Sequence, residues 1–210
     1  VGNPKLHSEI VRTLETSVEH VLFGRARVTV SAHRDSYRDL IHEHEVELDG
    51  EPRIHYENDE GTESWGTETS VHAGLGAGWS IRAGHAWSHS ESDDGEPHNF
   101  PAHVVNGGLR GPIAPGTYLA FAAAWVDHRR RELTDEEAAA DPDAVLRVPP
   151  YLLVDASLRT EGWGDRLGLQ VGVRNVLNRR ITDPVGAEHK PIVQVDQEPR
   201  TLHGAVDYRF

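Results

Sequence analysis

Strict alternation of apolar and polar residues near the end of the chain constrains its fold more than any other feature. The run 167–178 has an apolar residue at every second position up to residue 173, and the closing run repeats the pattern. A period of two predicts strands that have one apolar and one polar face. The apolar members are Leu167, Leu169, Val171 and Val173 in the first run, and Leu202, Val206, Tyr208 and Phe210 in the second.

Two all-β architectures accommodate such strands. In a soluble sandwich the apolar face packs inward against a second sheet, whereas in an outer-membrane barrel it contacts lipid and the polar face lines the lumen. Here the polar faces are rich in Arg, Glu, Gln and Asn, which suits a wet lumen at least as well as a solvated surface. A hydrophobic fraction of 37% with 20 glycines is low for a sandwich core and ordinary for a barrel.

Composition narrows the function classes. The net charge of -13 argues against binding to nucleic acid, whose phosphates would be repelled. The lack of cysteine excludes a disulfide framework and cysteine-based metal sites. No apolar run approaches the ~18 residues of a membrane helix, so a membrane protein would have to span with strands. Because the sequence begins at Val1 and contains no methionine, we expect a processed product or an excised fragment.

Turn signals divide the chain into about nine strands. Short turns are predicted at residue 24 and over 74–78, 114–116 and 162–165, and long connections over 42–51, 91–100, 130–148 and 179–198. Alternation of tight turns with long loops is typical of an up-and-down membrane barrel. The run 53–73 is predicted as one strand, because splitting it breaks this alternation. The other strands are predicted over 9–21, 26–37, 79–90, 102–112, 117–129, 151–160, 167–178 and the closing residues.

An odd count of nine predicts part of a barrel, because bacterial single-chain barrels have an even number of strands. Within the third long connection, Thr134 and Glu137 form a capping box, which predicts a short helix over 135–140.

Aromatic residues mark the two ends of the predicted strands. Trp79 and Trp87 share one face, and at ~3.4 Å per residue and a tilt near 40° they lie roughly 20 Å apart along the barrel axis. This is close to the spacing of two aromatic girdles, although two core tryptophans would explain the same pair. We predict a lipid-facing girdle of Trp79, Trp87, Trp125, Tyr208 and Phe210.

Six motifs occur in a fixed order along nearly the whole chain. They are Asn3-Pro4-Lys5-Leu6 with Glu9, Asp39-Leu40-Ile41, Tyr56 to Asn58 with Gly66 to Glu68, Phe100-Pro101-Ala102-His103, Asn175 to Pro184, and Asp207 to Phe210. In this order they resemble the C-terminal part of TonB-dependent outer-membrane receptors. Ser8 departs from the family pattern, which usually has proline there.

The resemblance implies a barrel of roughly 22 strands with a plugged lumen, of which this chain supplies the last nine or so. It implies a location in the bacterial outer membrane, insertion by the barrel-assembly machinery, and contact with outer-membrane lipid. It also implies a link to the TonB complex through an N-terminal part outside this sequence. The expected role is uptake of a large scarce nutrient, with an iron–siderophore complex first among the cargoes. The resemblance implies neither an enzyme nor a cofactor.

Candidate ligand-binding residues come from the long connections. Arg129, Arg130 and Arg131 could meet an anionic siderophore at a loop mouth. His42 and His44, with His55 or Asp49, could bind Zn²⁺, Ni²⁺ or Cu²⁺. Oxygens for Ca²⁺ come from Asp93, Asp94 and Glu96 beside His98. A solvated rim explains all three groups more simply, so no metal site is predicted, and no spacing indicates a catalytic residue.

Two other classes stay open at this point. An outer-membrane barrel enzyme, such as a small protease, requires a closed ten-strand barrel and a facing His–Asp pair. A soluble β-sandwich binding module requires the face of Leu167, Leu169, Val171 and Val173 to pack against another sheet.

Overall fold

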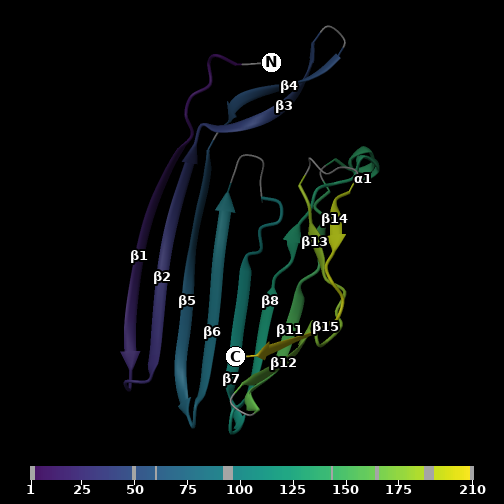
Figure 1. The fold of residues 1–210 in the computed structure, drawn as a ribbon. Helices are drawn as coiled ribbons and strands as arrows, with labels where there is room; N and C mark the ends of the chain where they lie inside the picture. The colour runs from purple at the N-terminus through teal and green to yellow at the C-terminus, as the bar shows by residue number, and fades with distance from the viewer. Residues whose placement is uncertain are drawn as a thin grey trace.

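A nine-stranded antiparallel sheet dominates the computed structural model, which describes residues 3–48, 51–59, 61–91, 97–142, 144–163, 166–186 and 192–208. Figure 1 shows the strands side by side in a curved sheet, with β1 at one edge and β15 at the other. In order across the sheet they are β1 (Ile10–Leu22), β2 (Ala26–Arg38), β5 (Thr62–Gly76), β6 (Trp79–Glu91), β7 (His103–Ala114), β8 (Thr117–Val126), β11 (Tyr151–Trp163), β12 (Leu167–Arg174) and β15 (Thr201–Tyr208).

The strand register assigns each residue to one of two faces, because directly paired residues point to the same side of a sheet. The apolar face is a continuous surface across the sheet. One row of it runs through Val28, Val71, Ala83, Gly107, Ala123 and Val154. The polar face has its own rows, such as Arg27, His72, Arg82, Gly108, Ala122 and Asp155. This confirms the alternation predicted from the sequence.

The sheet has no packed core within the described part of the chain. Only Val148, Ile181 and Val193 are buried hydrophobic residues there, and all three lie in the long loops. By contrast, Leu14 and Leu202 on the apolar face remain 75% and 77% exposed. A soluble sandwich would bury this face against a second sheet, so the sandwich interpretation is wrong. The single open sheet is a segment of barrel wall.

The region between β2 and β5 corrects two predictions. Residues 42–51 were expected to form a loop and 53–73 one long strand. Instead β3 (Leu40–Leu48) pairs with β4 (Glu51–Asp59) in a separate hairpin, and the wall strand β5 starts only at Thr62. The hairpin projects beyond the sheet at the long-loop rim (Figure 1). The count of nine wall strands still holds, because the hairpin belongs wholly to the connection.

The other long connections carry small elements at the same rim. The third contains β9 (Arg129–Arg130), α1 (Asp135–Ala140) and β10 (Arg147–Val148), and the fourth contains β13 (Thr182–Pro184) and β14 (Gln194–Asp196). The predicted strand 117–129 therefore ends earlier, at Val126. Thr134 and Glu137 form both bonds of the capping box, which confirms the predicted helix. No helix in the described ranges is long and apolar enough to cross a membrane.

Tight turns join the strands at the opposite rim. At Gly116 the backbone has φ +67°, and a Cβ atom there would lie 2.5 Å from the carbonyl oxygen of Glu161. Only glycine fits such a position without strain. The short and long connections thus alternate between rims, as the sequence predicted.

Candidate functional site

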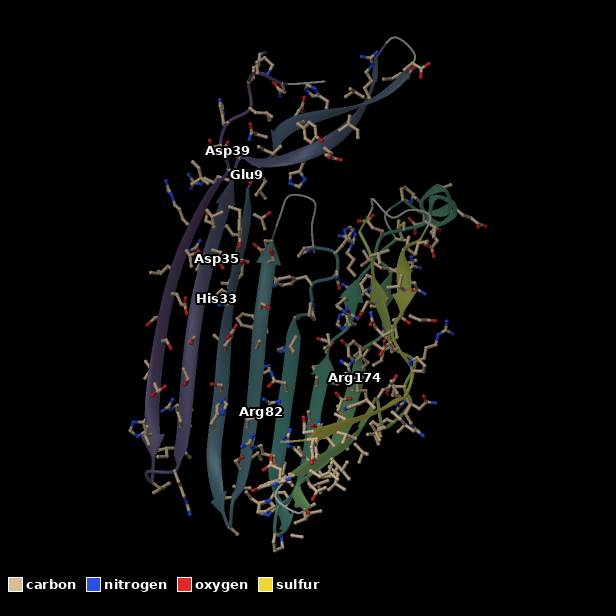
Figure 2. All side chains as sticks on the ribbon, in the orientation of Figure 1. Glu9, His33, Asp35, Asp39, Arg82 and Arg174 are labelled. Carbon is tan, nitrogen blue, oxygen red and sulfur yellow. The ribbon has the colours of Figure 1, made fainter. Side chains whose placement is uncertain are left out.

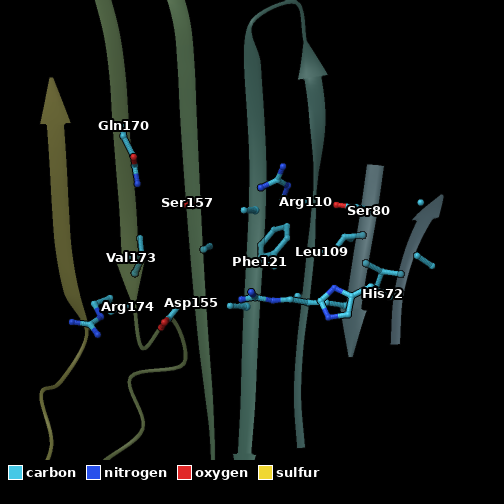
Figure 3. Close-up of a pocket in the computed structure, with 18 of the residues that line it drawn as sticks. His72, Ser80, Leu109, Arg110, Phe121, Asp155, Ser157, Gln170, Val173 and Arg174 are labelled. Atoms are coloured by element: carbon cyan, nitrogen blue, oxygen red, sulfur yellow. The ribbon is translucent and has the colours of Figure 1, made fainter. Parts of the chain in front are cut away.

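A cationic cavity lies against the polar face of the sheet, toward the tight-turn rim. Its volume is about 1020 Å³, and residues from seven neighbouring strands and the rim line it (Figure 3). Arg82, Arg110 and Arg174 come from β6, β7 and β12, and His72 and His203 come from β5 and β15. Figure 2 shows Arg82 and Arg174 rising from different strands of the wall.

Three of the guanidinium groups that line this cavity lack partners among the described residues. Within the described chain, the side chains of Arg82, Arg110 and Arg174 form no hydrogen bond or ion pair. The one carboxylate that lines the cavity belongs to Asp155, and its Oδ1 accepts a hydrogen bond of 2.9 Å from the backbone N–H of Asn175. Positive charge therefore exceeds negative charge in the lining of this cavity, which is the electrostatic requirement for holding an anion.

Glycines set how the cationic side chains lie. A Cβ atom on Gly108 would come within 2.8 Å of Nε of Arg82, so the Arg82 side chain lies flat across β7. The imidazole of His203 covers Gly172 in the same way. A larger residue at Gly108 or Gly172 would lift these groups toward the lumen.

Arg129 is buried where the long loops meet, whereas the sequence predicted it at the mouth of one long loop. Its side chain is only 7% exposed, and Nη1 lies 2.7 Å from Oδ1 of Asp183. Further bonds reach Oδ1 of Asn99 at 3.2 Å and the carbonyl of Thr182 at 3.1 Å, and the guanidinium lies 5.4 Å from the ring centre of Tyr151. Arg129 thus joins three of the four long connections in one loop bundle. Ligand contact by Arg129 stays a prediction.

The other two arginines of the triplet lie nearby. Arg131 makes a bidentate pair with Glu137, with bonds of 2.9 and 2.7 Å. That contact, together with the capping bonds to Thr134, lowers the pKa of Glu137 to about 2. The backbone carbonyl of Arg130 accepts a hydrogen bond from the N–H of Asn99 at 2.9 Å. The guanidinium group of Arg131 is therefore bound to Glu137 of α1. Ligand binding by Arg130 and Arg131 also remains a prediction.

The β3–β4 hairpin is fastened to the segment that precedes β1. Asn58 donates to the carbonyls of His7 and Asp39 at 3.0 and 2.7 Å and accepts from the N–H of His7 at 2.7 Å. Glu9 accepts from the N–H of Ile41 at 2.9 Å. These bonds explain why the Asn-Pro segment and the Tyr56 to Asn58 motif occur together in this sequence.

The histidine cluster of the hairpin is only partly described. In the backbone register His42 pairs with Glu57, and His44 pairs with His55. The His55 imidazole lies 3.4 Å from Glu57, while the His44 side chain and Asp49 lie outside the described part. Among the side chains that are described, no three metal-ligating groups converge. Asp93, Asp94 and Glu96 also lie outside it, and His98 pairs with Glu132 at 2.7 Å.

The four predicted girdle residues that the structure describes fall on the apolar face. Trp79 lies at the tight-turn end, where its indole covers Gly111. Trp87 and Trp125 lie toward the long-loop end, opposite His103 and Val105 in the register. Tyr208 pairs with Leu167 near the tight turns, and Phe210 lies outside the described residues. Lipid contact by these rings remains a prediction.

Sequence reasoning missed the residues that line the cavity. Arg82, Arg110 and Arg174 are separated by long stretches of sequence, and nothing in their local motifs is distinctive. The available signal was their place on the polar face of alternating strands, combined with the strand order. The meander places β6 next to β7, but only the strand register shows that the three arginines line one cavity.

Comparison with known proteins fits this geometry. The family described as "TonB dependent receptor-like, beta-barrel" matches residues 1–176. No curated protein matches the chain. Among solved structures, the siderophore receptor PirA from Acinetobacter baumannii is 15% identical with a TM-score of 0.78, covering 100% of this chain and 33% of its own. The ferric enterobactin receptor PfeA from Pseudomonas aeruginosa, as a G324V mutant, is 18% identical with a TM-score of 0.77 and coverages of 100% and 32%.

A third neighbour, the copper transporter OprC, is 16% identical with a TM-score of 0.74, covering 99% of this chain and 32% of its own. The chain thus spans about a third of the length of the solved receptors it matches. At these identities the structures establish the fold, and the family match covers most of the sequence. From the nine-strand wall and this match, the chain belongs to the family of TonB-dependent receptor β-barrels of the bacterial outer membrane.

Proposed function

We propose that this chain forms the last nine strands of a receptor that imports a metal chelate across the outer membrane, with an iron–siderophore complex as the cargo. The polar face would line the lumen, and the loop bundle and the β3–β4 hairpin would face the outside of the cell. Energy would come from the TonB complex through parts of the receptor outside this chain.

The observation that carries the proposal is the cationic cavity on the polar face. Fe³⁺ is a hard ion that siderophores hold through anionic oxygens, so many such complexes carry negative charge. Arg82, Arg110 and Arg174 place three unpaired guanidinium groups on the polar face, and guanidinium binds carboxylate-like oxygens in a bidentate geometry. Two of the similar structures are receptors for a siderophore or for ferric enterobactin and one is a copper transporter, which supports a metal-containing cargo.

Uptake by cells tests this function. Cells that lack the receptor would be given the siderophore fraction of their own culture medium loaded with radioactive iron. We expect the deletion to abolish TonB-dependent uptake and the full-length receptor to restore it. If the deletion leaves uptake unchanged, a ferric siderophore of this organism is not the cargo.

A second arm tests the cavity. The triple variant R82Q/R110Q/R174Q keeps the side-chain length and removes the charge, and we expect it to lower uptake at limiting substrate. The matched control is R27Q, because Arg27 lies on the same polar face but pairs with Glu19 at 3.5 Å. Uptake by the triple variant equal to that of R27Q would exclude the cavity from the transport route.

A further inference from the structure

Phe23 occupies a backbone position that does not suit a phenylalanine. The tight turn between β1 and β2 has positive φ at both central residues, 52° at Phe23 and 65° at Gly24, and the N–H of Arg25 donates to the carbonyl of Leu22 at 3.1 Å. Asn, Asp and Gly are the residues that favour such a turn. The Phe23 side chain is also 89% exposed. Neither the turn geometry nor packing within the described chain therefore explains a phenylalanine at this position.

The next two tight turns also carry an exposed apolar side chain at an irregular backbone position. Leu75 and Ile113 are each the extra residue of a register shift in their hairpins, β5–β6 and β7–β8. Their side chains are 55% and 53% exposed. A bulge of this kind re-aims a side chain out of the strand pattern. Figure 1 shows the three hairpins ending next to one another along the tight-turn rim. We refer to Phe23, Leu75 and Ile113 as the turn tips.

The apolar face of the wall reaches these turns without a formal charge. At the long-loop end this face carries ion pairs, with Arg34 at 2.6 Å from Glu63 and His89 at 3.2 Å from Glu91. Charged side chains are costly in hydrocarbon and tolerated at its boundaries, so the Arg34–Glu63 pair marks one boundary. At the tight-turn end, one paired row of the same face consists of Leu22, Ala26, Ala73, Ile81, Leu109 and Phe121.

Phe23 lies about one hydrocarbon thickness from that boundary. Arg34 is opposite Leu14 in the register, and Phe23 follows Leu14 by nine positions. At ~3.4 Å per residue and a tilt near 40°, this is roughly 23 Å along the membrane normal, against an apolar band of about 25 Å. His20, the one titratable side chain on this face of β1 between the two levels, is close to the turn, where polar groups cost least. Phe23 is therefore at the second boundary of the band.

We propose that the turn tips anchor the tight-turn rim in the interfacial layer of the surrounding leaflet, which is the periplasmic one in a receptor of this family. Aromatic side chains gather at this depth. The occupant is lipid and not a protein, because the tips continue the apolar face of the wall past the ends of its strands. Withdrawing the Phe23 ring from water offsets the strain of its positive φ. This anchor sets the depth of the wall and does not depend on the cargo.

Quenching of labels at the turn tips tests the anchor. The full-length receptor would carry a single cysteine, F23C or L75C, labelled with an environment-sensitive fluorophore and reconstituted into vesicles. We expect phosphatidylcholine brominated near the carbonyl end of its acyl chains to quench both labels, and aqueous iodide to quench them only weakly. The matched control is I192C, because Ile192 is 56% exposed, like Leu75, but lies in a long connection at the opposite rim. Its label should respond to iodide and not to the brominated lipid.

Hydroxyl-radical oxidation examines the native ring without a substitution. Phe23 should be oxidised much more slowly in vesicles than in the urea-unfolded receptor, and equal rates would overturn the anchor. Iodide quenching of F23C and L75C as strong as that of I192C, with no effect of brominated lipid, would also overturn it and would leave the tips free for a periplasmic protein. Quenching only by lipid brominated near the methyl end of its chains would place the tips too deep for an interfacial anchor. Unchanged far-UV circular dichroism would show that each labelled barrel is folded.

Discussion

The buried ion pair between Arg129 and Asp183 should decide whether the loop bundle stays closed. The substitution R129Q removes the charge, the 2.7 Å contact to Asp183 and the cation–π contact to Tyr151. Removing one partner of a buried pair costs about 3–5 kcal/mol, because the other charge is left without compensation. Asp183 is 27% exposed and can recover some hydration, so we expect a value near the lower end, about 3 kcal/mol.

A loss of this size would raise the equilibrium population of the locally opened state, and with it the exchange rate, roughly a hundredfold. Hydrogen exchange of the full-length receptor measures it directly, at the amides of Asn99 and Arg131, which donate across the bundle to Arg130 and Leu146. The control is R180Q, because Arg180 pairs with Asp196 on the surface with an 81% exposed side chain and should leave exchange unchanged. Exchange in R129Q equal to that in R180Q would refute the role assigned to Arg129.

Three further predictions concern the wall and the loops. V71R places a charge at the middle of the apolar face and should lower the free energy of unfolding by about 2–4 kcal/mol, measured by denaturant unfolding from vesicles. S70R places the same charge on the polar face and should cost much less. Equal costs would contradict the assignment of faces. N175A removes the two hydrogen bonds, of 2.8 and 3.0 Å, that join the fully buried Asn175 side chain to Arg179. The substitution should cost about 3 kcal/mol of local stability and speed hydrogen exchange at the Arg179 amide. Unchanged exchange would contradict this role of Asn175. The pKa of Glu137 is lowered from 4.5 to about 2. The stability that the Glu137 carboxylate gives to α1 should therefore persist at pH 4.5 and disappear as the pH falls through 2. Hydrogen exchange at the Ala138 amide would report this loss, and a loss already near pH 4.5 would contradict the prediction.

The wall of the barrel was predictable from the sequence because its physics is local. Each wall strand must show lipid one face and the lumen the other, so residues such as Leu169 and Gln170 alternate without regard to distant parts of the chain. The helix over 135–140 was predictable for the same reason, since its capping box lies within four residues.

The β3–β4 hairpin was not predictable in this way. The hairpin lies outside the wall, so neither of its faces needs to be apolar. The charged residues from His42 to Glu47 therefore predicted a loop. The break before β5 was hidden because the polar and apolar alternation continues through both strands. The burial of Arg129 was not predictable because its partner Asp183 lies 54 positions away, on another loop. The cavity was missed because its three arginines lie far apart in the sequence, and only the strand register places them along one cavity.

The central claim is that the apolar face contacts lipid and the polar face does not. Because this sequence has no cysteine, single cysteines can be introduced into this part of the receptor at Phe121 and at its neighbour Ala122, which lie on opposite faces. Each would carry an environment-sensitive fluorophore in the full-length receptor in vesicles. The account predicts that brominated lipid quenches the label at 121 and leaves the label at 122 unaffected. Quenching at 122 by the lipid, or protection of 121 from it, would contradict the account.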